Sequence, residues 1–89
     1  MKDKYFVYVL WSEKFSRKYV GMAENTESRL KEHNSGKTIS TKAFIPWEIV
    51  YKEEFITRVE AREREKYFKT AAGRKFLKEK LSLKKILVS

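Results

Sequence analysis

The sequence predicts an α+β fold in which a small three-stranded, largely antiparallel sheet is flanked by helices, in the order β-β-α-β-α-α. Two segments near the N-terminus, Phe6 to Leu10 and Lys18 to Met22, are rich in β-branched and aromatic residues and are joined by a polar-leaning connector. This pattern is typical of a β-hairpin. A third strand-like segment, Trp47 to Phe55, lies between two stretches with helical signals. Strands followed by helices that cover the sheet make an α+β sandwich.

Length and composition limit the kind of protein. With 89 residues the chain is too short for two hydrophobic cores, so we expect one domain over residues 1–89. The lack of cysteine excludes disulfides and thiolate metal sites, and a single histidine argues against a zinc enzyme. No apolar run approaches the roughly 20 residues of a membrane span and no signal-peptide pattern is present, so we expect a cytoplasmic protein outside the membrane.

The charge favours a polyanionic partner. Lys and Arg number 21 against 12 Asp and Glu, which gives a formal net charge of +9. Such an excess on a small domain favours nucleic acid, through phosphate contacts and counterion release. The composition alone leaves other readings open: ribosomal or membrane surfaces as partners, or Lys that only maintains solubility.

The first strand is expected to span Tyr5 to Trp11 and to lie at the centre of the sheet. Its residues are apolar or aromatic on both faces, with Val7 on one face and Tyr8 on the other. Such a strand is covered on both sides. The second strand can place Tyr19 beside Tyr8, and Gly21 is expected to end it where a side chain would obstruct a turn or a close approach.

The first helix is expected to span Thr26 to Asn34. Asn25 can cap its N-terminus, and Gly36 is a natural stop. Arg29 and His33 are four residues apart, so they lie side by side on one face of the helix. The polar loop that follows is long for a compact domain, which favours a functional or mobile segment.

Two further helices are expected after the third strand. Thr57 and Glu60 have the spacing of a capping box, which begins a helix that continues to about Ala72. Gly73 is expected to break this helix. Arg74 to Leu81 then forms a third, basic helix before a C-terminal tail.

Glu65 has an unusual position on the second helix. Three apolar residues recur at helical period and define an inward stripe: Ala61, Phe68 and Ala72. Glu65 falls on this stripe or at its edge, and cations flank it on the same helix: Arg58, Arg62 and Lys69. A carboxylate in such a place can bind a divalent metal while the cations receive phosphates. The alternative is an ordinary salt bridge from Glu65 to Lys69 or Arg62.

Together, these features resemble the GIY-YIG endonuclease family. The resemblance rests on an ordered set of side chains at matching spacing: Tyr8, Tyr19, Gly21, Arg29, His33 and Glu65. The family's two triplets fall on residues 6–8 and 19–21, and its helix Arg comes ten residues after the second Tyr. Small stand-alone members also carry a Thr-Lys segment and a Pro-Trp segment before the third strand, as residues 41–42 and 46–47 do here. The resemblance covers residues 5–81 of this chain. The chain is also similar to the N-terminal nuclease domain of the excision-repair endonuclease, which belongs to the same family.

The sequence departs from the family pattern at a few positions. Phe6 replaces the first Gly, and Val7 and Val20 replace Ile residues. These are sheet positions, so the chemistry is expected to survive. Met22 stands where some relatives place a Lys, which removes one cation that could activate the nucleophile or contact a phosphate.

The resemblance implies hydrolysis of a phosphodiester with Mg²⁺ or Mn²⁺ held by Glu65 and water. Arg29 would hold a phosphate oxygen with its fork of donors. Tyr8 is the first candidate to deprotonate or orient the attacking water, with Tyr19 as the second phenol. His33 is a competing base, since its unperturbed pKa of about 6.5 suits the task better than that of a tyrosine. Both candidates stay open at this point.

The expected substrate is nucleic acid, with DNA favoured over RNA, in repair or nucleic-acid processing. Further residues are candidates to contact it beside the site: Lys31, Asn34, Lys37, Lys42, Arg58, Arg62 and Lys69. Phosphate contacts of this kind position nucleic acid without reading its sequence. We therefore expect structure-selective or non-specific binding. We also expect a monomer, and a separate protein partner for targeting stays open.

Two other functions are compatible with the sequence. One is a nucleic-acid-binding module of the same fold that does not cleave. The other is a basic adaptor that docks an acidic protein partner through its third helix and tail, using Arg74, Lys75, Lys78, Lys80, Lys84 and Lys85. The adaptor leaves the arrangement of Tyr, Arg, His and Glu side chains unexplained.

Overall fold

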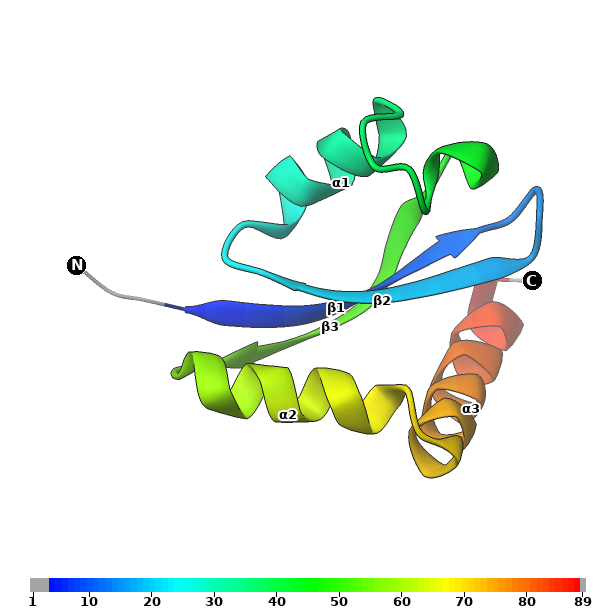
Figure 1. Cartoon of the computed structure of the whole chain (residues 1–89). Helices are drawn as coiled ribbons and strands as arrows, with labels where there is room; N and C mark the ends of the chain where they lie inside the picture. The colour runs from blue at the N-terminus through cyan, green and yellow to red at the C-terminus, as the bar shows by residue number, and fades with distance from the viewer. Residues whose placement is uncertain (1–3, 89) are drawn as a thin grey trace.

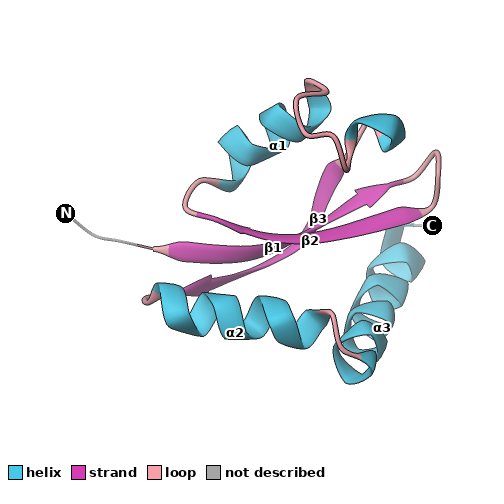
Figure 2. Cartoon of the chain, in the orientation of Figure 1, coloured by secondary structure: helices cyan, strands magenta, loops and turns pink. Residues whose placement is uncertain are grey.

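The computed structural model describes the backbone of residues 4–88 and the side chains of residues 4–81. The elements are β1 (Tyr5–Ser12), β2 (Arg17–Ala23), α1 (Thr26–Asn34), the 3-10 helix η1 (Lys42–Phe44), β3 (Glu48–Phe55), α2 (Arg58–Phe68) and α3 (Ala71–Val88). The predicted α+β class and the β-β-α-β-α-α order are confirmed. α1 lies on one face of the sheet, and α2 and α3 lie on the other (Figure 1; Figure 2).

The three strands form one antiparallel sheet in the order β2-β1-β3, so the first strand is central, as predicted. The hairpin register pairs Tyr8 with Gly21. Between β1 and β3 the register shifts at Val9/Leu10, where β3 has one extra residue. The expected end of the second strand at Gly21 is wrong, because β2 stays paired with β1 as far as Ala23.

Each face of the sheet has its own hydrophobic core, because β1 is apolar on both faces. The core beneath α2 and α3 is built from Val7, Val9, Val20, Ala61, Phe68 and Leu77. The core beneath α1 is built from Tyr8, Leu10, Ala23 and Trp47. The predicted division of β1 into two buried faces is therefore confirmed.

Local signals set the limits of α1 as predicted. The Asn25 side chain caps the helix by accepting a hydrogen bond from the Ser28 backbone N–H at 2.9 Å. Just beyond the helix, Gly36 has a φ of 83°, in the left-handed region that glycine adopts without strain. The loop that follows contains η1, and Thr41 within it is buried, with 1% of its surface exposed. This segment therefore packs against the domain instead of extending away from it.

The junction of α2 and α3 differs from the prediction. α2 begins at its predicted cap, but it ends at Phe68, and α3 begins at Ala71 and contains Gly73. A Cβ on Gly73 would lie 1.9 Å from the Tyr67 carbonyl oxygen and 2.6 Å from the Phe68 Cα. Gly73 thus allows the start of α3 to pack against the end of α2, and the expected helix break at this residue is wrong.

Two further expectations for this region are also wrong. Ala72 is exposed at the start of α3, so only Ala61 and Phe68 of the predicted inward stripe are buried. The expected C-terminal tail is helical, because α3 continues to Val88. Ser89 and the side chains of Lys84 and Lys85 lie outside the described residues.

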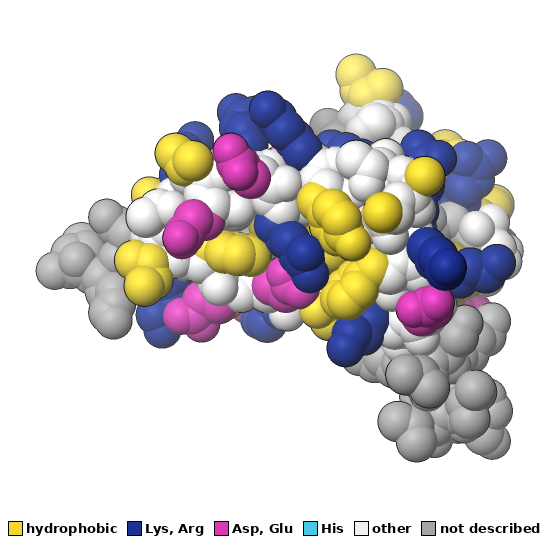
Figure 3. Space-filling model, turned by 90° about the horizontal axis from the view of Figure 1, so that it is seen from below, with side chains coloured by type: hydrophobic (Ala, Val, Ile, Leu, Met, Phe, Trp, Pro, Cys, Tyr) yellow, Lys and Arg dark blue, Asp and Glu magenta, His cyan; other side chains and the backbone are white. Residues whose placement is uncertain are grey.

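The surface formed by α2 and α3 carries charges of both signs. Figure 3 shows Lys and Arg side chains interspersed with Asp and Glu around hydrophobic ones on this face. The positive net charge is therefore not gathered into one continuous patch there. Among residues 4–88, no helix has both the length and the apolar composition of a membrane span.

Candidate active site

The candidate site begins where the Tyr8 ring crosses Gly21. These residues are partners in adjacent strands, and β2 is an edge strand. A Cβ on Gly21 would lie 2.6 Å from the Tyr8 hydroxyl oxygen and 2.7 Å from its Cζ. Only glycine at this position lets the phenol ring pass over β2 without a clash. The close approach that the sequence predicted at Gly21 is therefore present.

A buried chain of hydrogen bonds connects Tyr8 to α1 and to the following loop. The Tyr8 hydroxyl lies 3.1 Å from His33 Nε2, and His33 Nδ1 lies 2.9 Å from Thr41 Oγ1. The Thr41 hydroxyl donates to the Thr38 carbonyl at 3.4 Å, so its oxygen is free to accept from Nδ1–H. In that arrangement Nε2 accepts a hydrogen bond from the Tyr8 hydroxyl, and the imidazole is neutral.

Burial and nearby charges keep both rings neutral. Tyr8 and His33 are each 1% exposed. Burial, reinforced by Tyr19, raises the pKa of Tyr8 well above its ordinary value, and Arg29 offsets only part of this. Burial, together with the positive charge of Arg29, lowers the pKa of His33. Tyr8 therefore keeps its proton at neutral pH, while His33 is an unprotonated acceptor.

Aromatic neighbours fix the His33 ring. The Tyr19 ring centroid lies 4.9 Å from that of His33 and 6.4 Å from that of Tyr8. Trp47 lies behind Tyr19, with ring centroids 6.4 Å apart, and donates its indole N–H to the Thr41 carbonyl at 2.9 Å. The two tyrosines are therefore neighbours on the same face of the sheet, as predicted.

Arg29 and Glu65 approach the Tyr8 hydroxyl from α1 and α2. Arg29 lowers the pKa of Tyr8 and Glu65 raises it, so both charges act on this phenol. At present each has an ionic partner on its own helix: Arg29 Nε lies 3.2 Å from Glu32 Oε1, and Glu65 Oε2 lies 3.2 Å from Lys69 Nζ. The salt bridge expected as the alternative role of Glu65 is thus formed.

The donor set at Glu65 determines which metal ions the site fits. Among the described residues, no cluster of three or more His, Asp and Glu side chains is placed to hold a metal. The Glu65 side chain is 20% exposed at the edge of the core. Mg²⁺ commonly binds through one or two carboxylates and keeps several waters. Glu65 with water therefore fits Mg²⁺ or Mn²⁺, once Lys69, whose side chain is 57% exposed, releases the carboxylate.

The expected nucleic-acid contacts are spread over several elements. Six cationic candidates are exposed: Lys31, Lys37, Lys42, Arg58, Arg62 and Lys69. Asn34 is instead engaged within the fold: its Nδ2 donates to the Trp47 carbonyl at 3.0 Å, and its Oδ1 accepts from the Trp47 N–H at 2.6 Å. Both polar ends of the Asn34 amide therefore fasten the end of α1 to the start of β3.

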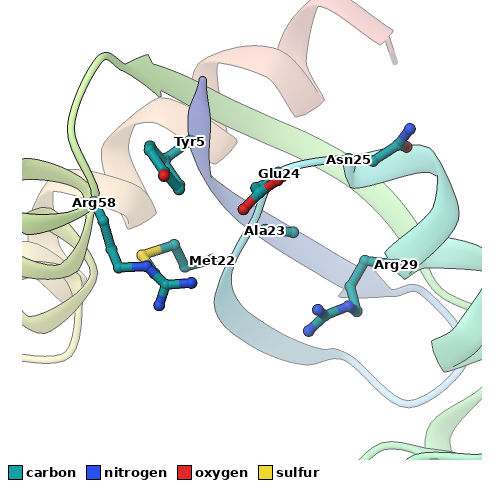
Figure 4. Close-up of a pocket in the computed structure, with 7 residues that line it drawn as sticks. All are labelled: Tyr5, Met22, Ala23, Glu24, Asn25, Arg29 and Arg58. Carbon is teal, nitrogen blue, oxygen red and sulfur yellow. The ribbon is translucent and has the colours of Figure 1, made fainter. Parts of the chain in front are cut away.

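A cavity of about 240 Å³ opens beside the site, where the end of β2 meets the first residues of α1 and α2 (Figure 4). Its lining residues are Tyr5, Met22, Ala23, Glu24, Asn25, Arg29 and Arg58. Figure 4 shows Arg58 and Arg29 reaching the cavity from opposite sides, with their guanidinium groups turned toward one another. Of the basic residues expected to contact nucleic acid, Arg58 is thus the one placed in a cavity with Arg29.

Sequence reasoning assigned no role in the site to Thr41 or Tyr5. Thr41 follows His33 by eight residues across an irregular loop, so no helical or strand periodicity connects them. Its place in the family's Thr-Lys segment was the one available signal. For Tyr5 the sequence predicts only the first residue of a strand, because the cavity that it lines forms between segments distant in sequence.

Comparisons with known proteins identify the family. Residues 4–79 match the model of the GIY-YIG catalytic domain. The chain is 39% identical over 77 residues to a UPF0213 protein of Staphylococcus epidermidis, which covers 85% of this chain and 93% of that protein. It is 41% identical over 68 residues to a UPF0213 protein of Bacillus licheniformis, which covers 75% of this chain and 69% of that protein. The chain therefore belongs to the GIY-YIG family of nuclease catalytic domains, among the small stand-alone UPF0213 proteins.

Proposed function

We propose that this protein hydrolyses phosphodiester bonds of DNA with a divalent metal ion, in DNA repair or nucleic-acid processing. The family supplies the reaction class, and a net charge of +9 suits a polyanionic substrate. The exposed cations position a phosphate backbone without reading bases. The activity is therefore proposed to be structure-selective or non-specific.

The observation that carries this proposal is the hydrogen bond between Tyr8 and His33 at 3.1 Å. A tyrosine whose pKa is raised stays protonated at neutral pH, so by itself it cannot take a proton from water. In the proposed step the attacking water gives a proton to the Tyr8 oxygen, while Tyr8 gives its own proton to His33 Nε2. The Nδ1–H bond to Thr41 holds the imidazole in place. Tyr8 and His33 therefore act in series, and neither is the base alone.

The charged residues are proposed to bind the phosphate and the metal. Arg29 exchanges its exposed Glu32 partner for a phosphate oxygen, which suits the planar donors of a guanidinium. Glu65 holds the divalent ion, which when bound neutralises charge on the phosphate and on the leaving oxygen. Tyr19 keeps the His33 ring in position by direct packing.

A non-cleaving nucleic-acid-binding module of the same fold is the second candidate. The Glu65–Lys69 ion pair favours it, because it occupies the carboxylate that the metal requires. Such a module would retain salt-dependent binding of nucleic acid and show no turnover with any metal.

The test is a cleavage assay on labelled single-stranded, duplex, nicked and branched DNA, and on RNA, with Mg²⁺, Mn²⁺ or EDTA. We expect metal-dependent cutting of DNA that is lost in Glu65→Gln and in Arg29→Ala. Glu63→Gln is the matched control, because Glu63 is an exposed carboxylate on the same helix. Binding without cutting would leave the second candidate, and equal cutting by Glu65→Gln would overturn the proposed site.

A further inference from the structure

The cavity beside the site has a mixed lining. A tyrosine ring and a thioether from the sheet, Tyr5 and Met22, supply apolar surface. Arg29 from α1 and Arg58 from α2 supply two cations (Figure 4). This combination can receive an anion together with the less polar group attached to it.

Arg58 is exposed and forms no ion pair among residues 4–81. Its guanidinium lies 5.8 Å from the centroid of the Tyr5 ring, which orients it over the cavity wall. Arg29 pairs with Glu32, but both side chains are about half exposed and the pair can open at little cost. Two guanidinium groups can therefore turn to one ligand in the cavity.

We propose that this cavity is a second phosphate subsite, which binds the sugar-phosphate unit adjacent to the cleaved bond. The neighbouring phosphate lies between Arg58 and Arg29, and its sugar contacts Tyr5 and Met22. This inference rests on the proposed function, because it assumes that Arg29 lies between the two phosphates and also contacts the cleaved one. It assigns Arg58 to binding, and not to the chemical step.

The size of the cavity supports a part of a strand as its occupant. Cavities that bury complete drug-sized ligands measure roughly 300–1,000 Å³, and this one measures about 240 Å³. A whole nucleotide cofactor is too large to be buried there, whereas one phosphate with its sugar is of suitable size. The strand then continues past both ends of the cavity.

Glu24 allows the effects of a negative and a positive charge in the same cavity to be compared. Its carboxylate lines the same cavity and is exposed. A phosphate between the two arginines would be repelled by this carboxylate. Removing the charge with Glu24→Gln should strengthen binding about two- to five-fold, and removing the opposite charge with Arg58→Gln should weaken it.

The first experiment measures binding of a fluorescent DNA oligonucleotide in EDTA by anisotropy, in a Glu65→Gln background that prevents cutting. We expect Arg58→Gln to weaken binding about five- to ten-fold. The slope of log K against log salt should become smaller in magnitude by about 0.7 to 0.9, the value for one phosphate contact. Lys66→Gln is the control, because it removes an exposed cation from the same helix at a position outside the cavity.

The second experiment locates the phosphate. Oligonucleotides carry a single neutral methylphosphonate at successive positions along the strand. At one position, next to the cleaved bond, the substitution should weaken binding by the protein with Arg58 and have little effect on Arg58→Gln. That coupling identifies the phosphate that Arg58 contacts.

The outcomes separate this inference from the proposed function. Equal effects of Arg58→Gln and Lys66→Gln, or a weakening by Glu24→Gln, would overturn the subsite while leaving cleavage by the wild type intact. A methylphosphonate scan without a coupled position would do the same. If the protein neither binds nor cuts nucleic acid, the proposed function fails and the subsite fails with it.

Discussion

At the scale of single residues, Thr41 determines the state of the buried network. Its hydroxyl oxygen accepts a hydrogen bond from His33 Nδ1–H, and this leaves Nε2 as the acceptor for Tyr8. Thr41→Val preserves the side-chain shape but leaves a buried ring nitrogen without a partner, which costs about 1–3 kcal/mol of stability. Under the proposed mechanism we also expect kcat to fall by about tenfold or more, with little change in KM.

The measurement for Thr41 pairs denaturant unfolding with steady-state kinetics. Thr41→Ser keeps the hydroxyl and should restore kcat and its pH dependence. A Thr41→Val enzyme with a normal kcat and a normal pH profile would show that the hydroxyl does not position His33.

Because the pKa of His33 is lowered in the folded chain, the free energy of unfolding should depend on pH. The unfolded chain binds a proton at His33 below about pH 6.5, while the folded chain resists protonation there. The free energy of unfolding therefore rises with pH as the unfolded chain loses this proton. The stability that the neutral, buried His33 contributes is lost as pH falls below about 6.5. Urea unfolding at pH 5 and pH 7.5 should show a larger acid loss for the wild type than for His33→Gln. Equal losses would contradict the burial of a neutral His33.

Replacing Gly21 should displace the Tyr8 ring. The Cβ of Gly21→Ala would lie 2.6 Å from the Tyr8 oxygen, so the Tyr8 ring has to move. Overpacking of this kind costs about 1–3 kcal/mol, and the displaced hydroxyl no longer meets His33. We expect circular dichroism to show a folded protein, and the cleavage assay to show a large loss of activity. Gly36→Ala is the control for lost stability alone: its φ of 83° makes alanine costly, but no atom beyond its chain neighbours lies within 4 Å of the added Cβ, so stability should fall while cleavage is retained.

At the scale of elements, Arg64 connects α2 to β3 and α3. Its guanidinium donates twice to Glu53 on β3, at 2.8 Å and 3.1 Å. It also lies 4.6 Å from the Phe68 ring centroid and 5.0 Å from the Phe76 ring centroid. This arrangement holds α2 against the sheet, and α2 in turn carries Glu65 and Arg58.

The Glu53 carboxylate should therefore stabilise the fold in a pH-dependent way. Burial raises its pKa, but the hydrogen bonds from Arg64 and Tyr51 outweigh burial and lower it overall. Its contribution is then present above the unfolded pKa of about 4.3 and is lost as pH falls through the lower folded pKa. We expect Glu53→Gln to cost about 1–3 kcal/mol at pH 7, measured by urea unfolding. A cost that persists unchanged at pH 2 would contradict an ionic role.

At the scale of the whole molecule, we expect the net charge of +9 to govern affinity for the proposed nucleic-acid substrate. If three or four phosphates are contacted, raising salt from 50 to 200 mM should weaken duplex binding by a factor on the order of 100. Anisotropy titrations across this range check the slope, and oligonucleotides of different sequence should give the same slope. Binding that is insensitive to salt would point away from a phosphate-dominated interface and toward a protein partner.

Local signals in the sequence were enough to predict the strands, their buried faces, the helix caps and the family. These features are local: alternation along β1 defines two faces, and Asn25 and Thr57 satisfy backbone N–H groups within three residues. The five side chains proposed for the site were also found from the sequence, because their order and spacing follow a family pattern.

The arrangement of those side chains could be seen only in the folded chain. Tyr8 and His33 are 25 residues apart, and the partner that fixes the imidazole lies in an irregular loop, so no periodic signal could connect the three. The same limit explains Gly73, which resembles a helix breaker in sequence but serves a close contact between helices. It also explains the Arg29–Arg58 cavity, since its walls come from strands and helices that meet only after the chain folds.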